Sequence, residues 1–232
     1  MSKSNTMKKL DSILASKEEI KEEIVAKGGS IDDSTPFAEH GDAIQELSGG
    51  VDTTLIDMIE GNEFDLIIPR KATKIARSAF RNNQYITTLY IPNTITAIDQ
   101  DSFASIPTLR SVEIEKGLEF LGKNMFASCT NLSSINIPNT VTKLDYGVFN
   151  GCSSLTYLVV PSSVSTYGSY CLNIGSPTNQ ATIRFEHTVP PAVPNSAMTL
   201  ANIKEIQVPA GSAEAYKSKT TFANYAELIV EF

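Results

Sequence analysis

The sequence predicts a mainly β protein with short helices, in which a solenoid of 23-residue units follows an N-terminal helical pair. Three observations support the solenoid: proline recurs with a period of 23, phenylalanine follows the first four of these places by eleven residues, and an apolar alternation precedes each of them. The prolines are Pro69, Pro92, Pro138 and Pro161, with Glu115 in the remaining place, and the phenylalanines are Phe80, Phe103, Phe126 and Phe149. Each such unit buries its apolar face only against its neighbours, so the units must stack.

Residues 1–50 predict two helices. Ser16 and Glu19 form a capping box, and Lys27 followed by two glycines ends the first helix. Thr35 before Pro36 starts the second helix. A hairpin of this size does not fold alone, so we expect it to dock on the solenoid, on its own copies or on another protein. The candidate assembly residues are Ile20, Ile24, Phe37, Ile44 and Leu47.

Residues 51–232 predict the solenoid, with the segment after Gly50 expected to cap its first unit. In each of five legible units an alternation such as Leu89/Ile91 forms a short strand with one buried face. Proline ends this strand because it lacks the N–H that a ladder needs. A second alternation, such as Ile95/Ile98, predicts another short strand, and the phenylalanine fills the space between the two strands.

The repeat changes after Pro161. Residues 176–180 (SPTNQ) add two residues in a loop, and the proline-rich stretch 187–194 replaces the second half of its unit. In the expected C-terminal cap, residues 210–232, Ser212 caps a short helix from Ala213 and the ending LIVEF supplies a closing strand. An atypical last unit is what an exposed solenoid end requires.

Charge and composition exclude several classes of function. The net charge of −7 argues against a nucleic-acid partner, which needs a basic face. No apolar run has the length of a signal peptide or a membrane span, so we expect no membrane insertion. The chain has three cysteines, and this odd number indicates reduced thiols in a protein made in the cytoplasm. Such a protein can still leave the cell by another route, such as inside a virus particle.

The stretch GLEFLGKN, residues 117–124, has the spacing of a phosphate-binding loop but lacks the Ser or Thr after the lysine. Leu118 and Leu121 occupy the columns of the second strand, so we interpret the stretch as part of a repeat. Cys129 and Cys152 lie one period apart, where a disulfide or a metal is conceivable, although a buried column of small residues is the favoured interpretation.

Other candidate sites lack the spacing that their chemistry needs. His40 and His187 lack metal-site spacing, and Asp99 and Asp101 lack the glycine and distal glutamate of a calcium loop, which favours solvated turn carboxylates. We therefore expect no enzyme activity, no cofactor and no metal.

The first strands carry an outward row that can bind a partner. Its candidate binding residues are Tyr90, Glu113, Asn136, Tyr157 and Arg184. Tyrosine and arginine are favoured in binding surfaces, so this row could contact sugars or protein. A plain solvated sheet is the alternative interpretation.

The units TTLYIPNTITAIDQDSFASIPTL (87–109) and SSINIPNTVTKLDYGVFNGCSSL (133–155) resemble the BspA-type (Treponema pallidum-like) leucine-rich repeat. The resemblance runs from about Thr54 to Phe232. It implies the fold, while such repeats serve adhesion and scaffolding alike.

Residues 17–47 resemble a short helical module of phage virion proteins. His40 stands where that module has tyrosine. Seven residues match its pattern: Ile20, Ile24, Lys27, Gly28, Pro36, Phe37 and Ile44. This resemblance implies a non-enzymatic virion structural protein (fibre, tail or head decoration) in which residues 1–50 attach or oligomerise. The implied partners are other virion proteins, its own copies as a homo-oligomer, and a host cell-surface glycan or protein. The alternative is a BspA-like adhesion or interaction protein of the bacterial cell surface.

Overall fold

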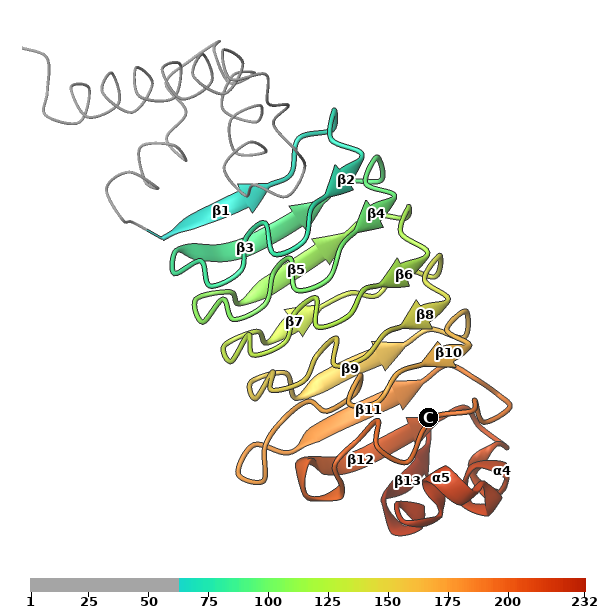
Figure 1. Ribbon diagram of the computed structural model, residues 1–232. Coiled ribbons are helices and arrows are strands. Elements are labelled where there is room, and N and C mark those ends of the chain that lie inside the picture. The colour runs from blue at the N-terminus through green and yellow to red at the C-terminus, as the bar shows by residue number, and fades with distance from the viewer. Residues whose placement is uncertain (1–62) are drawn as a thin grey trace, which may run out of the picture. The chain divides into compact units, whose positions relative to one another are not determined.

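The computed structural model describes residues 63–232, so the predicted helical pair of residues 1–50 and its candidate assembly residues lie outside the described part. Asp65–Phe232 form one compact unit, in which short strands stack rung upon rung (Figure 1). The predicted class, a mainly β solenoid of 23-residue units, is confirmed for this unit.

Each rung begins with a first strand, and most rungs add a second strand of two residues. The first strands are β1 (Phe64–Ile67), β3 (Ile86–Ile91), β5 (Ser111–Ile114), β7 (Ser134–Ile135), β9 (Tyr157–Val160), β11 (Ala181–Phe185), β12 (Ile203–Val208) and β13 (Ile229–Glu231). The second strands are β2 (Lys74–Ile75), β4 (Ala97–Ile98), β6 (Phe120–Leu121), β8 (Lys143–Leu144) and β10 (Thr166–Tyr167). The remaining elements are η1 (Leu200–Asn202), α4 (Ala213–Ser218), α5 (Thr220–Ala223) and η2 (Ala226–Leu228).

The first strands form two four-stranded sheets, ordered β1-β3-β5-β7 and β9-β11-β12-β13. Pairing is parallel and in step with the repeat, with Tyr90 opposite Glu113 and Leu89 opposite Val112. The proline after a first strand turns the chain toward the second strand, because its carbonyl accepts the N–H three residues on, as from Ile95 to Pro92 at 3.1 Å.

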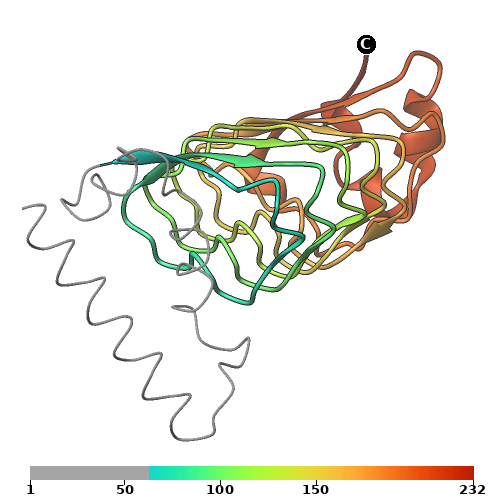
Figure 2. The same cartoon turned by 90° about the horizontal axis from the view of Figure 1, so that it is seen from above.

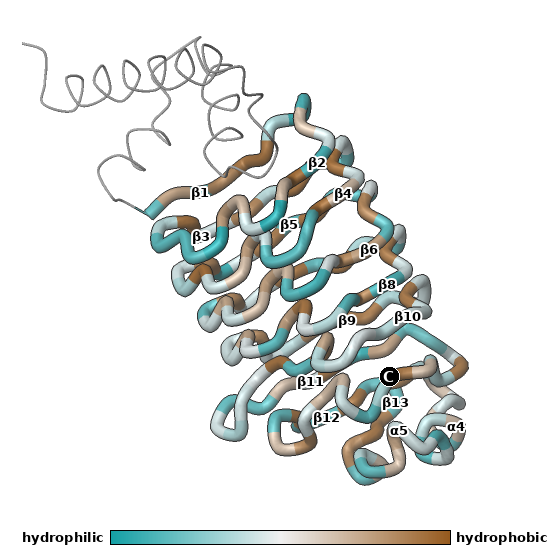
Figure 3. The backbone as a smooth tube through the Cα atoms, viewed as in Figure 1, coloured by the Kyte–Doolittle hydropathy of each residue, from teal (hydrophilic) through white to brown (hydrophobic). Residues whose placement is uncertain are grey.

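The phenylalanine column fills the interior, as predicted. Phe80, Phe103, Phe126 and Phe149 stack with successive ring centroids 5.2, 5.8 and 6.1 Å apart. Apolar segments recur rung after rung along the chain (Figure 3), and the view from above shows successive rungs overlying one another (Figure 2). Because Phe103, Phe126 and Phe149 are fully buried, the core is a continuous column.

The stretch GLEFLGKN is the second strand of its unit, as interpreted from the sequence. Phe120 and Leu121 pair in parallel with Lys143 and Leu144. A Cβ atom at Gly117 would lie 2.6 Å from the Asn93 carbonyl oxygen, so this glycine permits the close approach of two rungs.

The prediction of solvated turn carboxylates needs correction at one of its two residues. Asp101 is a buried residue with a φ of 60°, and its carboxylate accepts a hydrogen bond from Asn124 at 3.0 Å, so it is not a solvated turn carboxylate. Asp99 behaves more nearly as expected, since it forms a surface ion pair with Lys74 at 3.1 Å.

The predicted capping bond of Ser212 also needs correction. Ser212 stands at the N-cap of α4 but makes no side-chain capping bond, because its hydroxyl donates to the Pro209 carbonyl instead.

The short helix from Ala213 and the closing strand within LIVEF form as predicted. The strand β13 pairs in parallel with β12, which places Ile229 opposite Ile206. The buried rings of Tyr216 and Phe222, on the short helices α4 and α5, pack 6.0 and 5.5 Å from the ring of Phe185. These aromatic contacts continue the core beyond the last phenylalanine of the repeat.

Candidate functional site

The predicted outward row lies on the first strands. Tyr90 and Glu113 are register partners on β3 and β5, Tyr157 pairs with Thr182, and Arg184 pairs with Val159. Glu113, Asn136 and Tyr157 are exposed, whereas Tyr90 and Arg184 are half-buried. The structure thus places the five side chains along one surface without gathering them into one cluster.

Two members of the row already have partners. The Arg184 guanidinium lies 3.5 Å from the ring centroid of Phe232, so the C-terminal residue covers it. The Tyr90 hydroxyl bonds to Glu115 and accepts from Arg70 at 3.1 Å. Glu113, Asn136 and Tyr157 are therefore the members of the row that remain open to a ligand.

The hydrogen-bonded ladder of first strands opens at β7. This strand has only two residues, and it pairs with β5 at Ser134 and Ile135 alone (Figure 1). At the start of the stack, the Ile68 N–H donates to the Tyr90 carbonyl at 3.0 Å. Ile137 follows β7 as Ile68 follows β1, and the next first strand after β7 is β9. Within residues 63–232, no backbone bond joins the Ile137 N–H to the carbonyl of Val159 on β9.

A groove lies at this opening, with a volume of about 550 Å³. It runs across the carboxyl ends of β5, β7 and β9, and its walls combine carboxylates, side-chain amides and prolines. The lining residues are Asn93, Ile114, Glu115, Lys116, Asn136, Ile137, Pro138, Asn139, Val159, Pro161 and Glu186. Of the five predicted binding residues, Asn136 lines this groove.

Arg70 fixes one wall of the groove. Its guanidinium holds the Glu115 carboxylate through bonds of 2.7 and 3.1 Å, and its Nη1 donates to Asn93 at 3.2 Å. The Asn93 N–H also donates to Glu115 at 2.8 Å. Bonds from Arg70, Tyr90 and Asn93 stabilise the charged form, which lowers the pKa of Glu115 to about 2.

Glu115 was visible in the sequence only as the residue that interrupts the proline column. Its role depends on Arg70, which lies 45 residues earlier, and the apolar pattern contains no signal for that pair. A charged residue at a place where the other units have proline was the one hint available.

The chemistry of the groove suits binding. Glu115 is held as a carboxylate, and the side-chain amides of Asn136 and Asn139 can both donate and accept hydrogen bonds. In the described part of the chain, no group of three His, Cys, Asp or Glu side chains is arranged to hold a metal ion. Among the same residues, no helix is long and apolar enough to cross a membrane.

The cysteine column is a buried part of the core. Cys129 and Cys152 are free thiols whose Sγ atoms lie 3.1 Å from the carbonyls of Phe103 and Phe126. Burial raises the pKa of Cys129 to about 11 and that of Cys171 to about 12. The favoured interpretation of Cys129 and Cys152, as small core side chains, agrees with this environment.

Comparison with solved structures gives the same fold. A leucine-rich repeat protein from Bacteroides ovatus matches with a TM-score of 0.50 and 15% identity, over 72% of this chain and 42% of that protein. A leucine rich cell surface protein from Faecalibacterium prausnitzii matches with a TM-score of 0.44 and 23% identity, over 74% of this chain and 48% of that protein. The chain therefore spans less than half the length of either protein.

Comparison with curated protein sequences gives no significant match. The family model described as the BspA type leucine rich repeat region matches six copies across residues 62–178, about half of the chain. This match agrees with the rungs, the proline turns and the phenylalanine column. The chain belongs to the BspA-type leucine-rich repeat family.

Proposed function

We propose that this chain is a non-enzymatic adhesion or interaction protein that binds a protein partner through the groove at β7. The observation that carries the proposal is the coincidence of the ladder opening with a polar groove of about 550 Å³. Repeat solenoids generally bind partners through extended surfaces, and leucine-rich repeats commonly serve as interaction scaffolds.

The wall residues suit a polar partner. The exposed Glu113 and Tyr157 lie on the strands that flank the groove, and Asn136 and Lys116 line it. An aromatic ring beside amides and charges is the composition of a protein-binding surface, where tyrosine often carries much of the binding energy. The surface location follows by analogy with the relative from Faecalibacterium prausnitzii, which is described as a cell surface protein.

The test uses the full chain on an array of surface proteins from bacteria and their hosts. Asn136→Arg places a long charged side chain in the groove, and Thr130→Arg places the same side chain at an exposed position that does not line it. The proposal requires a protein that binds the unmodified chain and Thr130→Arg but loses at least tenfold in affinity with Asn136→Arg. Binding that survives Asn136→Arg unchanged would show that the partner uses another surface.

A second candidate function rests on the resemblance of residues 17–47 to a phage virion module. In that proposal residues 1–50 form an assembly module through Ile20, Ile24, Phe37, Ile44 and Leu47, and residues 51–232 present the solenoid with its cap at 210–232. The protein would then be a virion component with copies of itself or other virion proteins as partners.

Light scattering separates the two candidates. The virion proposal predicts an oligomer for the full chain and a monomer for a chain that starts at Val51. Monomers in both cases would remove the self-assembly version of the virion proposal and leave the interaction protein as the better account.

A further inference from the structure

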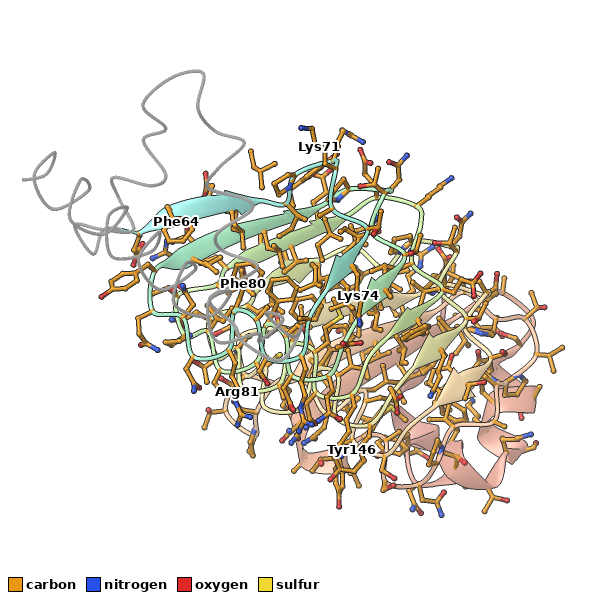
Figure 4. All side chains as sticks on the ribbon, turned by 45° about the horizontal axis from the view of Figure 1, so that its top comes forward. Phe64, Lys71, Lys74, Phe80, Arg81 and Tyr146 are labelled. Atoms are coloured by element: carbon orange, nitrogen blue, oxygen red, sulfur yellow. The ribbon has the colours of Figure 1, made fainter. Side chains whose placement is uncertain are left out.

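A second surface, on the flank of the solenoid that carries β4, β6, β8 and β10, has a basic and aromatic row. We define this row as Arg77, Gln100, Lys123, Tyr146 and Tyr170. Backbone bonds place the first four residues on successive rungs, since the N–H of Ser78 donates to Gln100, that of Asp101 to Lys123 and that of Asn124 to Tyr146, at 3.1, 3.0 and 2.8 Å. The Gly147 N–H donates to Ser169, so Tyr170 stands one residue beyond this column and joins the row through its ring contact with Tyr146. Figure 4 shows Tyr146 on the same flank as Lys74 from β2.

The side chains of the row form two contacting groups, and all of them are exposed except the half-buried Gln100. The Lys123 ammonium lies 5.6 Å from the centroid of the Tyr146 ring, and that ring meets Tyr170 edge to face at 5.7 Å. The two tyrosines are each 42% exposed. In the amide orientation that pairs donors with acceptors, Gln100 accepts from Arg77 at 2.6 and 2.9 Å.

The row has positive charge to offer. The neighbouring Lys74 and Lys143 form ion pairs with Asp99 and Asp145 at 3.1 and 2.8 Å. Within residues 63–232, Arg77 and Lys123 form no ion pair, although these residues contain 13 basic and 13 acidic side chains. These two cations stand two rungs apart, about 10 Å at the usual spacing of parallel strands. Lys123 also acts on Asp145 without direct contact, since its charge contributes to the lowered pKa of that carboxyl group.

Tyr170 has a backbone conformation that its own type disfavours. Its φ is 60°, in a column where the preceding rungs have Ser78, Asp101, Asn124 and Gly147 at 53 to 64°. Small polar residues and glycine tolerate this conformation, whereas a bulky side chain there is an outlier. Strain of this kind gathers at ligand sites, and here it holds an aromatic ring against Tyr146 at the surface.

We propose that this row binds an acidic glycan. The tyrosine rings would receive the C–H faces of the sugars, Gln100 would bond to hydroxyl groups, and Arg77 and Lys123 would pair with carboxylate or sulfate groups. An extended peptide fits less well, because the backbone carbonyls of Gln100, Lys123 and Tyr146 already accept bonds from the adjacent rungs. A ligand here must bind through side chains alone.

The experiment titrates the full chain, by calorimetry at low salt, with an oligogalacturonate and with a heparin fragment. A cello-oligosaccharide of the same length serves as the neutral glycan, and polyglutamate serves as the acidic peptide. The proposal predicts that at least one acidic glycan binds tighter than both comparison ligands. Failure of both acidic glycans to bind, or equal or tighter binding of polyglutamate, would overturn it.

Variants place the binding on the row. Tyr146→Ala and Lys123→Gln should each weaken acidic-glycan binding at least tenfold, whereas the matched surface controls Tyr85→Ala and Lys204→Gln should leave it within twofold. Equal losses in the controls would assign the binding to the overall charge of the chain.

Tyr170→Asn distinguishes binding from a structural role. Asparagine accepts a positive φ more readily than tyrosine, so the variant should keep or raise Tm while it weakens glycan binding. A lowered Tm with unchanged binding would mean that the ring serves the fold, and the proposal would fail.

Discussion

The strand ladders and the turns that carry the phenylalanines behave differently within the same rungs. The first strands lose their ladder between β7 and β9, and the second strands form separate ladders, β2-β4 and β6-β8-β10. On the turn side, by contrast, Phe80, Phe103 and Phe126 each donate an N–H to the next rung, at 2.8, 3.1 and 3.0 Å. We call these turns, residues 78–82, 101–105, 124–128 and 147–151, the spine.

This difference indicates that the strand ladders tolerate interruption better than the spine does. The spine and its stacked rings hold one rung on the next, so a strand ladder can open without separating the rungs. The groove lies at such an opening, where the backbone contributes little to stacking. A repeat protein can in this way vary its binding surface while its core column stays constant.

The largest effect should come from the spine. Phe126→Ala removes a fully buried ring that stacks between Phe103 and Phe149 at 5.8 and 6.1 Å. The substitution should lower the free energy of unfolding by about 3–5 kcal/mol, measured by denaturant titration. Phe120→Ala, at a ring that is 39% exposed on β6, is the control and should cost less than about 1 kcal/mol. Similar losses in the two variants would contradict the special role of the spine.

A smaller effect on stability should come from the ladder of second strands β6-β8-β10. A Cβ atom at Gly168 would lie 2.4 Å from the Tyr146 backbone nitrogen, so Gly168→Ala forces two rungs apart next to β10. We expect a loss of about 1–3 kcal/mol in the free energy of unfolding, as for other overpacked positions. Ser169→Ala, on the adjacent residue, should cost under about 1 kcal/mol. An unchanged stability in Gly168→Ala would mean that the rungs separate there freely.

The wall of the groove should respond to pH. The pKa of Glu115 is lowered in the folded chain to about 2, so its bonds stabilise the fold above the unfolded value near 4.5. That contribution is lost as the pH falls from about 4.5 through about 2. Glu115→Gln should therefore have a lower Tm than the unmodified chain at pH 7, and the difference should shrink toward pH 2.

Arg70→Gln is the matched variant for this pair, because it removes the partner and leaves the carboxyl group. It should reproduce most of the loss of Tm at pH 7. A Tm difference for Glu115→Gln that is the same at every pH would show that the ion pair contributes nothing to the fold.

The smallest effect on stability should come from Asn136, which lines the groove. Asn136 is exposed, and Asn136→Ala should change the free energy of unfolding by no more than about 0.5 kcal/mol. Denaturant titration measures this value, with Asn131→Ala, at an exposed asparagine whose amide donates to the Pro107 carbonyl, as the comparison. A loss above about 1 kcal/mol in Asn136→Ala would mean that the opening is itself part of the scaffold.

The repeat was readable in the sequence because each of its columns performs one physical task. Proline ends a first strand, phenylalanine fills the column, and alternation marks one buried face. Those tasks alone predict the stacking of Phe126 in the interior column and the parallel pairing of Phe120 with Lys143.

The groove and its wall could not be predicted in the same way. The opening at β7 depends on hydrogen-bond geometry beyond Ile135, although its unit reads like its neighbours. The Arg70–Glu115 pair joins residues 45 apart. The burial of Asp101 and the conformation of Tyr170 both depend on a turn with positive φ. The apolar pattern of the sequence contains no signal for that turn.

Amide hydrogen exchange tests the central claim most directly, that the spine holds the rungs while the first ladder opens at the groove. The account predicts strong protection for the Phe103 and Phe126 amides and for the Glu186 amide, which donates to Val160 at 3.0 Å. The Ile137 amide should exchange much faster than all three. Protection of Ile137 equal to that of Phe126 would mean that the ladder is closed at β7, and the account would be contradicted.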